Sequence, residues 1–230
     1  MSRPSLIASL AYPNAAALPS DGTARVAPAD MVEVRLDAVE GEADTAVALC
    51  REVAGWGRPL LVTPRSPGEG GMRQWQAGER SALLDALWAE IAPAAVDVEL
   101  RDSPRLLEWT VANGPAGTEV IASFHDFEGF PGVGWLEVLA LEAQAKGADR
   151  FKAAVRVADP GEMADLACWT RSRSRSFPLI TMAVGAAGSL SRLMNGAFGS
   201  GACYAHIEEA TAPGQLSVAE LAPLLERFYV

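Results

Sequence analysis

The chain contains two lysines, and the position of one of them suggests covalent chemistry. Of its 19 lysine and arginine residues, only Lys146 and Lys152 are lysine. Lys152 lies in an apolar segment, where loss of contact with water favours the uncharged amine relative to its reference pKa of ~10.4. An uncharged amine attacks carbonyl carbons, which an arginine cannot do. Lys152 is therefore predicted to form a Schiff base with a ketone, and an ion pair with a neighbouring carboxylate at the rim of the fold is the structural alternative.

Histidine is almost as rare as lysine, and one of the two histidines ends an apolar segment. His125 follows Ser-Phe and precedes Asp126. Its reference pKa of ~6.5 suits a group that takes up and returns protons at neutral pH, although a histidine in such a place is often only a hydrogen-bonding residue. His206 has no comparable neighbours and is interpreted as structural. His125 is therefore the candidate general acid and base.

Two glycine-rich segments could bring polar groups close to a small ligand. Residues 63–71, TPRSPGEGG, place Arg65 and Glu69 in a tight turn, for which an ordinary surface turn is the alternative. In residues 185–192, Gly185 and Gly188 precede Arg192 after an apolar segment, in a position where barrel proteins often bind anions. Taken alone, the glycine spacing of this segment is weak evidence for such a site.

Eight apolar segments recur at intervals of roughly 24 to 36 residues, which is typical of alternating strands and helices in a parallel barrel. Most are hydrophobic almost throughout, as strands covered on both faces should be. The sequence predicts a single catalytic domain over 1–230, with the (β/α)8 or TIM-barrel fold. The predicted strands are residues 5–11, 31–37, 59–65, 95–100, 119–126, 149–157, 177–184 and 202–206.

The connections between these segments carry helix signals, with one exception. Proline follows Ser103 and Asp159 at two expected helix starts, and Ser217 with Glu220 forms a capping box before the last helix. Residues 12–30 contain three prolines and a glycine, which leave no room for a long helix. The first helix of the barrel is therefore expected to be degenerate.

Charged residues inside the predicted strands also mark a site, because a charge in a barrel must reach the open mouth or find a partner. Glu33 and Arg35 lie on one face of the second strand by the two-residue alternation, and Arg65 ends the third. Barrel enzymes place their chemistry at the carboxyl ends of the strands. These three residues are therefore candidate binding residues around Lys152 and His125.

Composition excludes several classes of function. A net charge of −10 and a pI near 4.7 argue against nucleic acid as a partner, despite a short basic run at 171–175. No apolar run approaches the ~18 residues of a membrane span, and the apolar stretch near the N-terminus is too short for a secretory signal. Cys50, Cys168 and Cys203 are widely spaced without histidines at metal-ligand spacing. We expect a cytoplasmic protein with reduced thiols and no metal site.

Several of these segments together resemble the type I 3-dehydroquinate dehydratases. VDVEL at 96–100, followed nineteen residues later by VIASFHD at 120–126, is similar to the histidine signature of that family. The resemblance runs nearly from end to end and is specific to the family rather than to the fold. Its further motifs, in order, are EVRLD at 33–37, TPRSPGEGG at 63–71, GADRFKAAV at 147–155, SRLMNGAFGS at 191–200 and TAPGQLS at 211–217.

The resemblance implies a reaction and a set of roles. Members of the family are (β/α)8 barrels, usually homodimers, that perform the syn dehydration of the small molecule 3-dehydroquinate to 3-dehydroshikimate in the shikimate pathway, without metal or cofactor. By this resemblance Lys152 forms the imine, His125 is the general acid and base, and Glu69 orients it. The remaining matching residues would hold the substrate: Arg192 its carboxylate, Glu33, Arg35 and Arg65 its ring hydroxyls, and Thr211 and Gln215 in a loop that folds over it.

The sequence departs from the family pattern at three positions. Val184 stands where the family usually has a methionine near the imine, and Thr211 stands where serine is common. Arg150 occupies a normally apolar position on the strand face of Lys152. None of these departures removes a catalytic group.

Two other functions remain as alternatives. Another Schiff-base barrel enzyme, such as a class I aldolase, would share the lysine but not the SFHD histidine or the TAPGQ loop. A catalytically silent barrel would only bind a carboxylate metabolite or a partner protein. The sequence does not distinguish aromatic biosynthesis from quinate breakdown.

Overall fold

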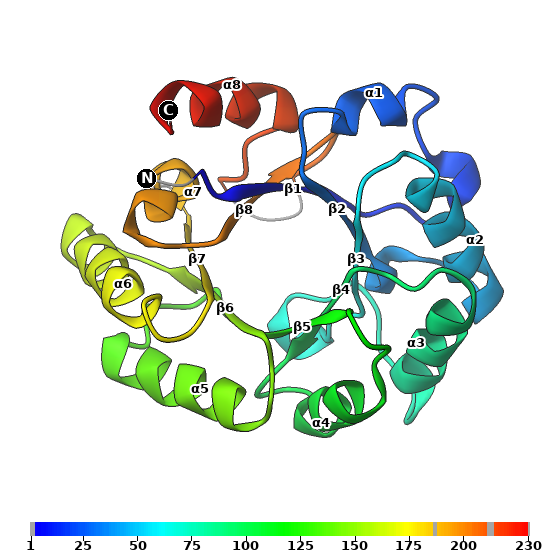
Figure 1. Cartoon of the computed structure of the whole chain (residues 1–230), viewed down its shortest axis with the longest axis horizontal. Helices are drawn as coiled ribbons and strands as arrows, with labels where there is room; N and C mark the ends of the chain where they lie inside the picture. The colour runs from blue at the N-terminus through cyan, green and yellow to red at the C-terminus, as the bar shows by residue number, and fades with distance from the viewer. Residues whose placement is uncertain (1–2, 186–187, 211–213, 230) are drawn as a thin grey trace.

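Eight parallel strands form a nearly closed barrel in the computed structural model, which describes residues 3–185, 188–210 and 214–229 (Figure 1). Each predicted strand segment contains one of them, so the predicted (β/α)8 barrel is confirmed. The strands are β1 (Ser5–Leu10), β2 (Met31–Arg35), β3 (Leu60–Thr63), β4 (Ala95–Glu99), β5 (Glu119–Asp126), β6 (Arg150–Arg156), β7 (Leu179–Val184) and β8 (Ala202–His206).

Helices surround the barrel as an outer ring (Figure 1). They are α1 (Gly22–Val26), α2 (Ala43–Ala54), α3 (Glu79–Glu90), α4 (Pro104–Asn113), α5 (Val133–Ala145), α6 (Pro160–Arg173), α7 (Gly188–Met194) and α8 (Val218–Phe228). Short 3-10 helices are η1 (Ala15–Ala17), η2 (Leu36–Ala38), η3 (Pro67–Glu69) and η4 (Asn195–Phe198). The first connection holds only η1 and the five-residue α1, as expected for a degenerate first helix.

The predicted helix starts are present, but their caps differ. The Asp159 side chain accepts hydrogen bonds from the second and third backbone N–H groups of α6, and Ser217 and Glu220 form the expected capping box of α8. Ser103 precedes α4, yet its hydroxyl caps no backbone N–H group. The N–H groups of Arg105 and Leu106 in the first turn of α4 therefore lack the side-chain acceptor that an N-cap residue normally provides.

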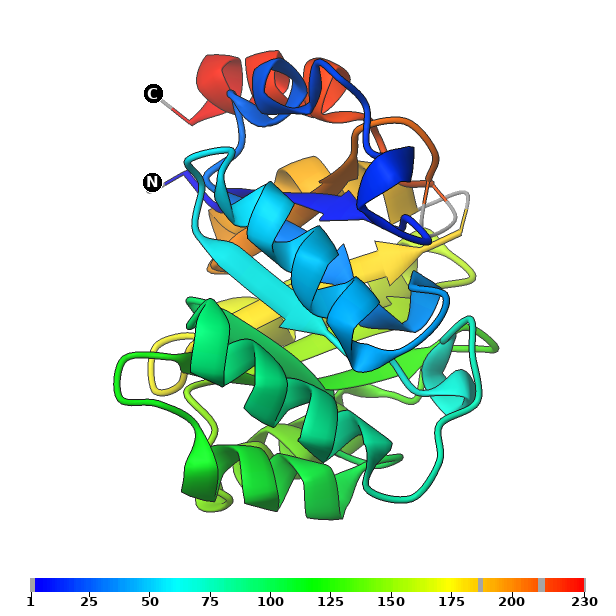
Figure 2. The ribbon, with the colours of Figure 1, turned by 90° about the vertical axis from the view of Figure 1, so that its right-hand side faces the viewer.

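Side chains inside the barrel change from apolar to charged along its axis. Near the amino ends of the strands, Ile7, Leu61, Ile121 and Ile180 belong to one buried apolar cluster. Charged and polar side chains follow towards the carboxyl ends, where the strand arrowheads lie on one side of the molecule (Figure 2). The apolar layer closes one end of the barrel, so the reactive residues face the other.

Arg150, the unexpected charge in β6, lies at the amino end of the barrel. Its guanidinium Nε is 2.6 Å from a carboxylate oxygen of Glu119 at the start of β5, and both side chains are partly exposed. The two residues thus form an ion pair at the amino-terminal mouth. Arg150 shares a strand face with Lys152 but does not enter the cluster of charges around it.

Backbone ladders join all neighbouring strands except β7 and β8. In the described part of the chain no ladder joins these two strands, and an isolated bridge links Leu179 of β7 to Ser200, two residues before β8. Side chains take the backbone groups of β7 on this side: Ser200 and Asn195 bind the backbone of Thr181, and Ser191 binds the backbone of Ala183. We call this junction the seam of the barrel.

Two further predictions concern membrane-spanning helices and the cysteine thiols. No helix in the described ranges is long and apolar enough to cross a membrane. Cys50, Cys168 and Cys203 are free thiols, and only Cys168 is exposed.

Candidate active site

A cavity at the carboxyl ends of the strands brings together the predicted site residues that the structure describes. Its lining includes Glu33, Arg35, Arg65, Glu69, His125, Lys152, Arg192 and Gln215, together with Phe127, Ala154, Met182, Val184 and Tyr204. Thr211 lies outside the described residues. Within the described ranges, no group of three or more histidine, cysteine or acidic side chains could hold a metal ion.

Lys152 is buried inside the barrel among acidic side chains. It is 4% exposed, and its Nζ donates a hydrogen bond of 2.8 Å to Asp97 and lies 4.0 Å from a carboxylate oxygen of Glu33. The amine also sits 4.1 Å from the centre of the Tyr204 ring, a cation–π distance. The ion pair that was the structural alternative is thus present, but it lies in the cavity lining with His125 rather than in an isolated contact at the rim.

Asp97 is a central residue that the sequence analysis missed. It is fully buried and accepts hydrogen bonds from Arg65 at 3.0 Å, Ser123 at 2.6 Å and Lys152 at 2.8 Å. Burial alone would raise the pKa of Asp97, but Arg65 and then Lys152 outweigh it and hold the pKa below its usual range. The available signal was a charge inside an apolar strand, two residues from Glu99 on the same face.

Glu69 holds the imidazole of His125 in one orientation. One carboxylate oxygen of Glu69 lies 2.9 Å from Nδ1 of His125 and also accepts the backbone N–H of that residue at 2.8 Å. Glu69 ends η3, and the next residue, Gly70, has a φ of +86°, which favours glycine. The glycine-rich segment is therefore the turn that places the Glu69 carboxylate next to Nδ1 of His125.

Burial shifts the two members of this pair in opposite directions. It raises the pKa of Glu69 to about 8. It lowers the pKa of His125 well below its usual value, with the charges of Arg65 and Lys152 acting in the same direction. The neutral imidazole of His125 already carries one proton. The next proton that the His125–Glu69 pair takes up therefore binds to the Glu69 carboxylate rather than to the imidazole. Once that proton is lost, Nδ1–H donates to the ionised Glu69 and the lone pair of Nε2 is free to act as a base.

Arg192 is a buried cation with no acidic partner in the described part of the chain. It is 2% exposed, and within the described residues its guanidinium donates to the carbonyls of Gly214 and Tyr204, at 3.2 and 3.4 Å, and to the sulfur of Met182. Its Nη2 has no hydrogen-bond partner in the same residues, and burial lowers the pKa of Arg192 to about 10. A buried cation without an acidic partner binds an anion favourably, because the anion replaces the lost contact with water.

The other two arginines of the cavity are already paired. Two guanidinium nitrogens of Arg35 donate to the carboxylate of Asp37, at 2.7 and 2.9 Å. The guanidinium of Arg65 donates to Asp97, Glu99 and Ser123. Asp37 is a second buried acid that the sequence analysis missed. Of the three cavity arginines, Arg192 is therefore the one without an acidic partner among the described residues.

Glu33 is also held from inside the barrel, where the hydroxyls of Ser9 and Thr63 donate to its two carboxylate oxygens. Gln215 is buried and belongs to the segment after β8. Val184 and Met182 line the cavity from β7, so an apolar wall is retained where the sequence departs from the family pattern.

Comparisons with known proteins agree on one family. The sequence model described as type I 3-dehydroquinase matches residues 7–230. A 3-dehydroquinate dehydratase from Aromatoleum aromaticum is 33% identical over 86% of this chain and 79% of its own, and one from Enterococcus faecalis is 30% identical over 98% and 92%. A type I 3-dehydroquinate dehydratase from Clostridium difficile, solved with covalently modified comenic acid, superposes with a TM-score of 0.91 at 25% identity, covering 100% of this chain and 94% of the other.

Proposed function

Because the chain belongs to the type I 3-dehydroquinase family, a family of hydro-lyases, we propose that it dehydrates 3-dehydroquinate to 3-dehydroshikimate through a Schiff base on Lys152. The observation that carries this proposal is the burial of a single lysine in one cavity with a carboxylate-held histidine and an unpaired arginine. Together they supply a nucleophile, a proton carrier and an anion site.

The first step joins Lys152 to the substrate ketone. Nζ attacks C3, and loss of one water gives an imine that carries a positive charge when protonated. Asp97 and Glu33 lie beside this nitrogen and stabilise that charge. The cationic imine withdraws electrons from C2, so a proton on C2 becomes acidic.

Proton transfer by His125 completes the elimination. Nε2 removes the C2 proton and returns it to the C1 hydroxyl, which leaves as water while the C1–C2 double bond forms. Each such transfer contributes typically ~10²–10⁴-fold. A second water then hydrolyses the imine and frees Lys152, so the net reaction releases one water.

The remaining cavity residues position the ring. Arg192 binds the substrate carboxylate, and Glu33, Arg35 and Arg65 contact the ring hydroxyls with groups that their own hydrogen-bond partners hold in place. Gln215 belongs to the segment after β8 that covers the substrate. We extend the proposal to Thr211, to a single catalytic domain over 1–230, and to a cytoplasmic homodimer in the shikimate pathway. The support for these points is the family and the near-complete coverage of its members.

A direct assay tests the reaction. The purified protein, incubated with 3-dehydroquinate, should generate the ultraviolet absorbance of a conjugated enone, and borohydride reduction in the presence of substrate should leave an adduct on Lys152. A class I aldolase would produce no enone, and a silent barrel would give neither signal.

Arg192→Ala should raise KM by an amount equivalent to roughly 2–5 kcal/mol, as when one partner of a buried charge pair is removed. The variant should still form the borohydride-trapped adduct at high substrate concentration, because the amine is intact. Arg192→Lys, which keeps the charge but loses the planar fork, should lie between the variant and the wild type. Steady-state kinetics measure all three proteins. An unchanged KM would place the carboxylate elsewhere in the cavity.

Turnover should fall as pH drops through the titration of the His125–Glu69 pair, because the second proton blocks the free base form. Burial raises the pKa of Glu69 to about 8, so the acid limb lies above the value of ~6.5 expected for a histidine alone. Glu69→Gln should lower kcat roughly 10²-fold and move the acid limb to lower pH, because only an imidazole with a lowered pKa then remains. A pH–rate profile of both proteins is the measurement, and an acid limb that does not move would remove Glu69 from the titrating group.

A further inference from the structure

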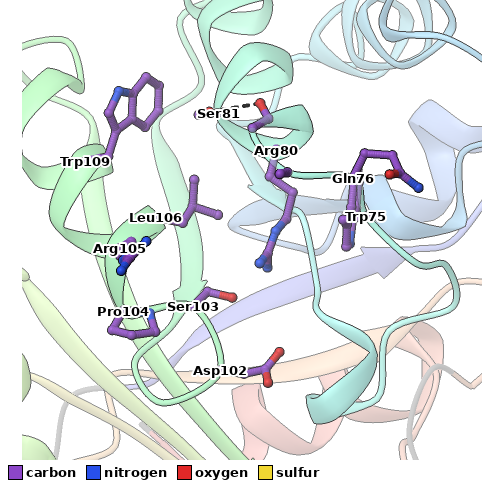
Figure 3. Close-up of a pocket in the computed structure, with 12 residues that line it drawn as sticks. Trp75, Gln76, Arg80, Ser81, Asp102, Ser103, Pro104, Arg105, Leu106 and Trp109 are labelled. Carbon is purple, nitrogen blue, oxygen red and sulfur yellow. Dashed lines mark hydrogen bonds between the residues drawn. The ribbon is translucent and has the colours of Figure 1, made fainter.

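A second pocket, separate from the catalytic cavity, lies between α3 and α4. It has a volume of about 780 Å³ and is walled by Trp75 on one side and by Leu106 and Trp109 of α4 on the other (Figure 3). None of its lining residues belongs to the lining of the catalytic cavity. The reaction proposed above makes no use of this pocket.

The pocket concentrates positive charge at a helix start. Arg80 enters it from α3, and Arg105 lies in the first turn of α4, which contains no acidic residue. A cation in the first turn opposes the helix dipole, which favours negative charge there. Arg105 is exposed and has no ion pair in the described part of the chain. An anion at this place would satisfy both the arginine and the free N–H groups of the turn.

The buried hydroxyl of Ser103 also indicates an anion site. Ser103 is 4% exposed and is the N-cap residue of the ten-residue α4, and its Oγ makes no hydrogen bond to any residue that the structure describes. The hydroxyl points into the space between the two helices, towards the Arg80 side chain (Figure 3). A buried hydroxyl normally has a partner, so a donor is left available for an oxyanion.

The one acidic side chain of the lining does not neutralise these cations. Asp102 forms no ion pair within the described ranges, and its carboxylate lies against Gly68 beside η3. Arg80 shares Glu99 with Arg65, since Nη1 of Arg80 is 3.2 Å from one Glu99 oxygen and Arg65 binds the other at 3.0 Å. Glu99 is therefore shared by two arginines. Arg105 has no acidic partner in the described part of the chain.

We propose that this pocket binds a small ring-bearing oxyanion, a carboxylate or a phosphate. The head group is held by Arg105, Arg80, the Ser103 hydroxyl and the free N–H groups at the start of α4. The ring lies between the apolar walls, where Trp75 is fixed by its indole N–H donating to the carbonyl of Arg65 at 2.9 Å and Trp109 stacks on Trp88. The ligand class follows from an anion site flanked by aromatic surface.

Titration with phenyl phosphate, benzoate and inorganic phosphate, followed by the indole N–H signals in ¹H–¹⁵N spectra, tests the proposal. The signals of Trp75 and Trp109 should shift and saturate with a ring-bearing probe. The signal of Trp169, which donates to Glu137 outside the lining of this pocket, should not. The described lining of the catalytic cavity contains no tryptophan, but it includes Arg65, whose carbonyl accepts the indole N–H of Trp75. The Trp109 signal is therefore the one that distinguishes this pocket from the catalytic cavity. Phenyl phosphate and benzoate distinguish the two head groups, and inorganic phosphate alone should bind more weakly than phenyl phosphate.

Two variants make the test specific. Arg105→Gln and Ser103→Ala should each weaken binding of the better probe about tenfold or more, as expected for loss of a hydrogen bond to a charged group. Arg171→Gln on α6, which also removes an exposed arginine, should leave it unchanged. Arg105 is exposed, so its replacement does not endanger folding. Absence of a saturable shift with both ring-bearing probes, or a shift unaffected by Arg105→Gln, would overturn the proposal.

Discussion

Turnover of 3-dehydroquinate is expected to be lost when Lys152 is replaced by alanine and equally when it is replaced by arginine. Alanine removes the amine, whereas arginine keeps a positive charge beside Asp97 but cannot form an imine. The rate should fall by more than about 10⁴-fold in both variants, as on removal of a catalytic nucleophile. The arginine variant separates covalent chemistry from charge, because a purely electrostatic role would survive it.

Lys146→Arg is the matched control, since it makes the same change at the other lysine. Lys146 follows the last residue of α5 and pairs with Glu108 on the outside of the barrel. An arginine preserves that contact, so turnover and thermal stability should be unchanged. Near-normal activity of either Lys152 variant, in protein that melts cooperatively, would rule out the Schiff base.

His125→Ala should lower kcat by about 10²–10⁴-fold, because proton removal from C2 and proton return to the leaving hydroxyl both lose their carrier. The variant should nevertheless accumulate the imine, since Lys152 contacts Asp97 and Glu33 rather than the imidazole. Mass spectrometry of the borohydride-reduced protein measures the adduct directly.

The outcome for His125→Ala divides the mechanism into its two halves. An adduct with little turnover assigns imine formation to Lys152 and elimination to His125. Absence of the adduct in folded protein would mean that His125 also takes part in carbinolamine formation or dehydration. Lys152→Ala, which cannot form the adduct at all, provides the background.

The strands of this barrel were predictable because burial on both faces demands nearly continuous apolar segments, and such segments are visible without any structure. The segments at 119–126 and 202–206 coincide with β5 and β8. The short first helix followed equally from the prolines in residues 12–30. The restriction that proline places on the backbone and the spacing of apolar residues can both be read from a short stretch of sequence. The strands and the short first helix could therefore be predicted without knowledge of the tertiary contacts.

Pairing between distant residues was not predictable in this way. Asp97 contacts a lysine 55 positions away and an arginine 32 positions away, and only the closed barrel brings the three together. The same limit explains Arg65, whose charge is taken up by Asp97 and Glu99 from 32 and 34 positions away. Arg35 differs, because its partner Asp37 is only two residues along the chain. Residue types indicated which side chains could react, whereas the availability of each charge depended on its neighbours in space.

The seam between β7 and β8 makes one junction of the barrel depend on particular side chains. A backbone ladder tolerates almost any residue except proline, so the other junctions are robust to point mutation. At the seam, Asn195 and Ser200 provide the bonds that another strand would otherwise supply to Thr181. Substitutions at these two positions therefore act on barrel closure itself. We therefore expect substitutions to be tolerated less along this line than at the backbone-paired junctions, and the line runs beside α7, which carries Arg192.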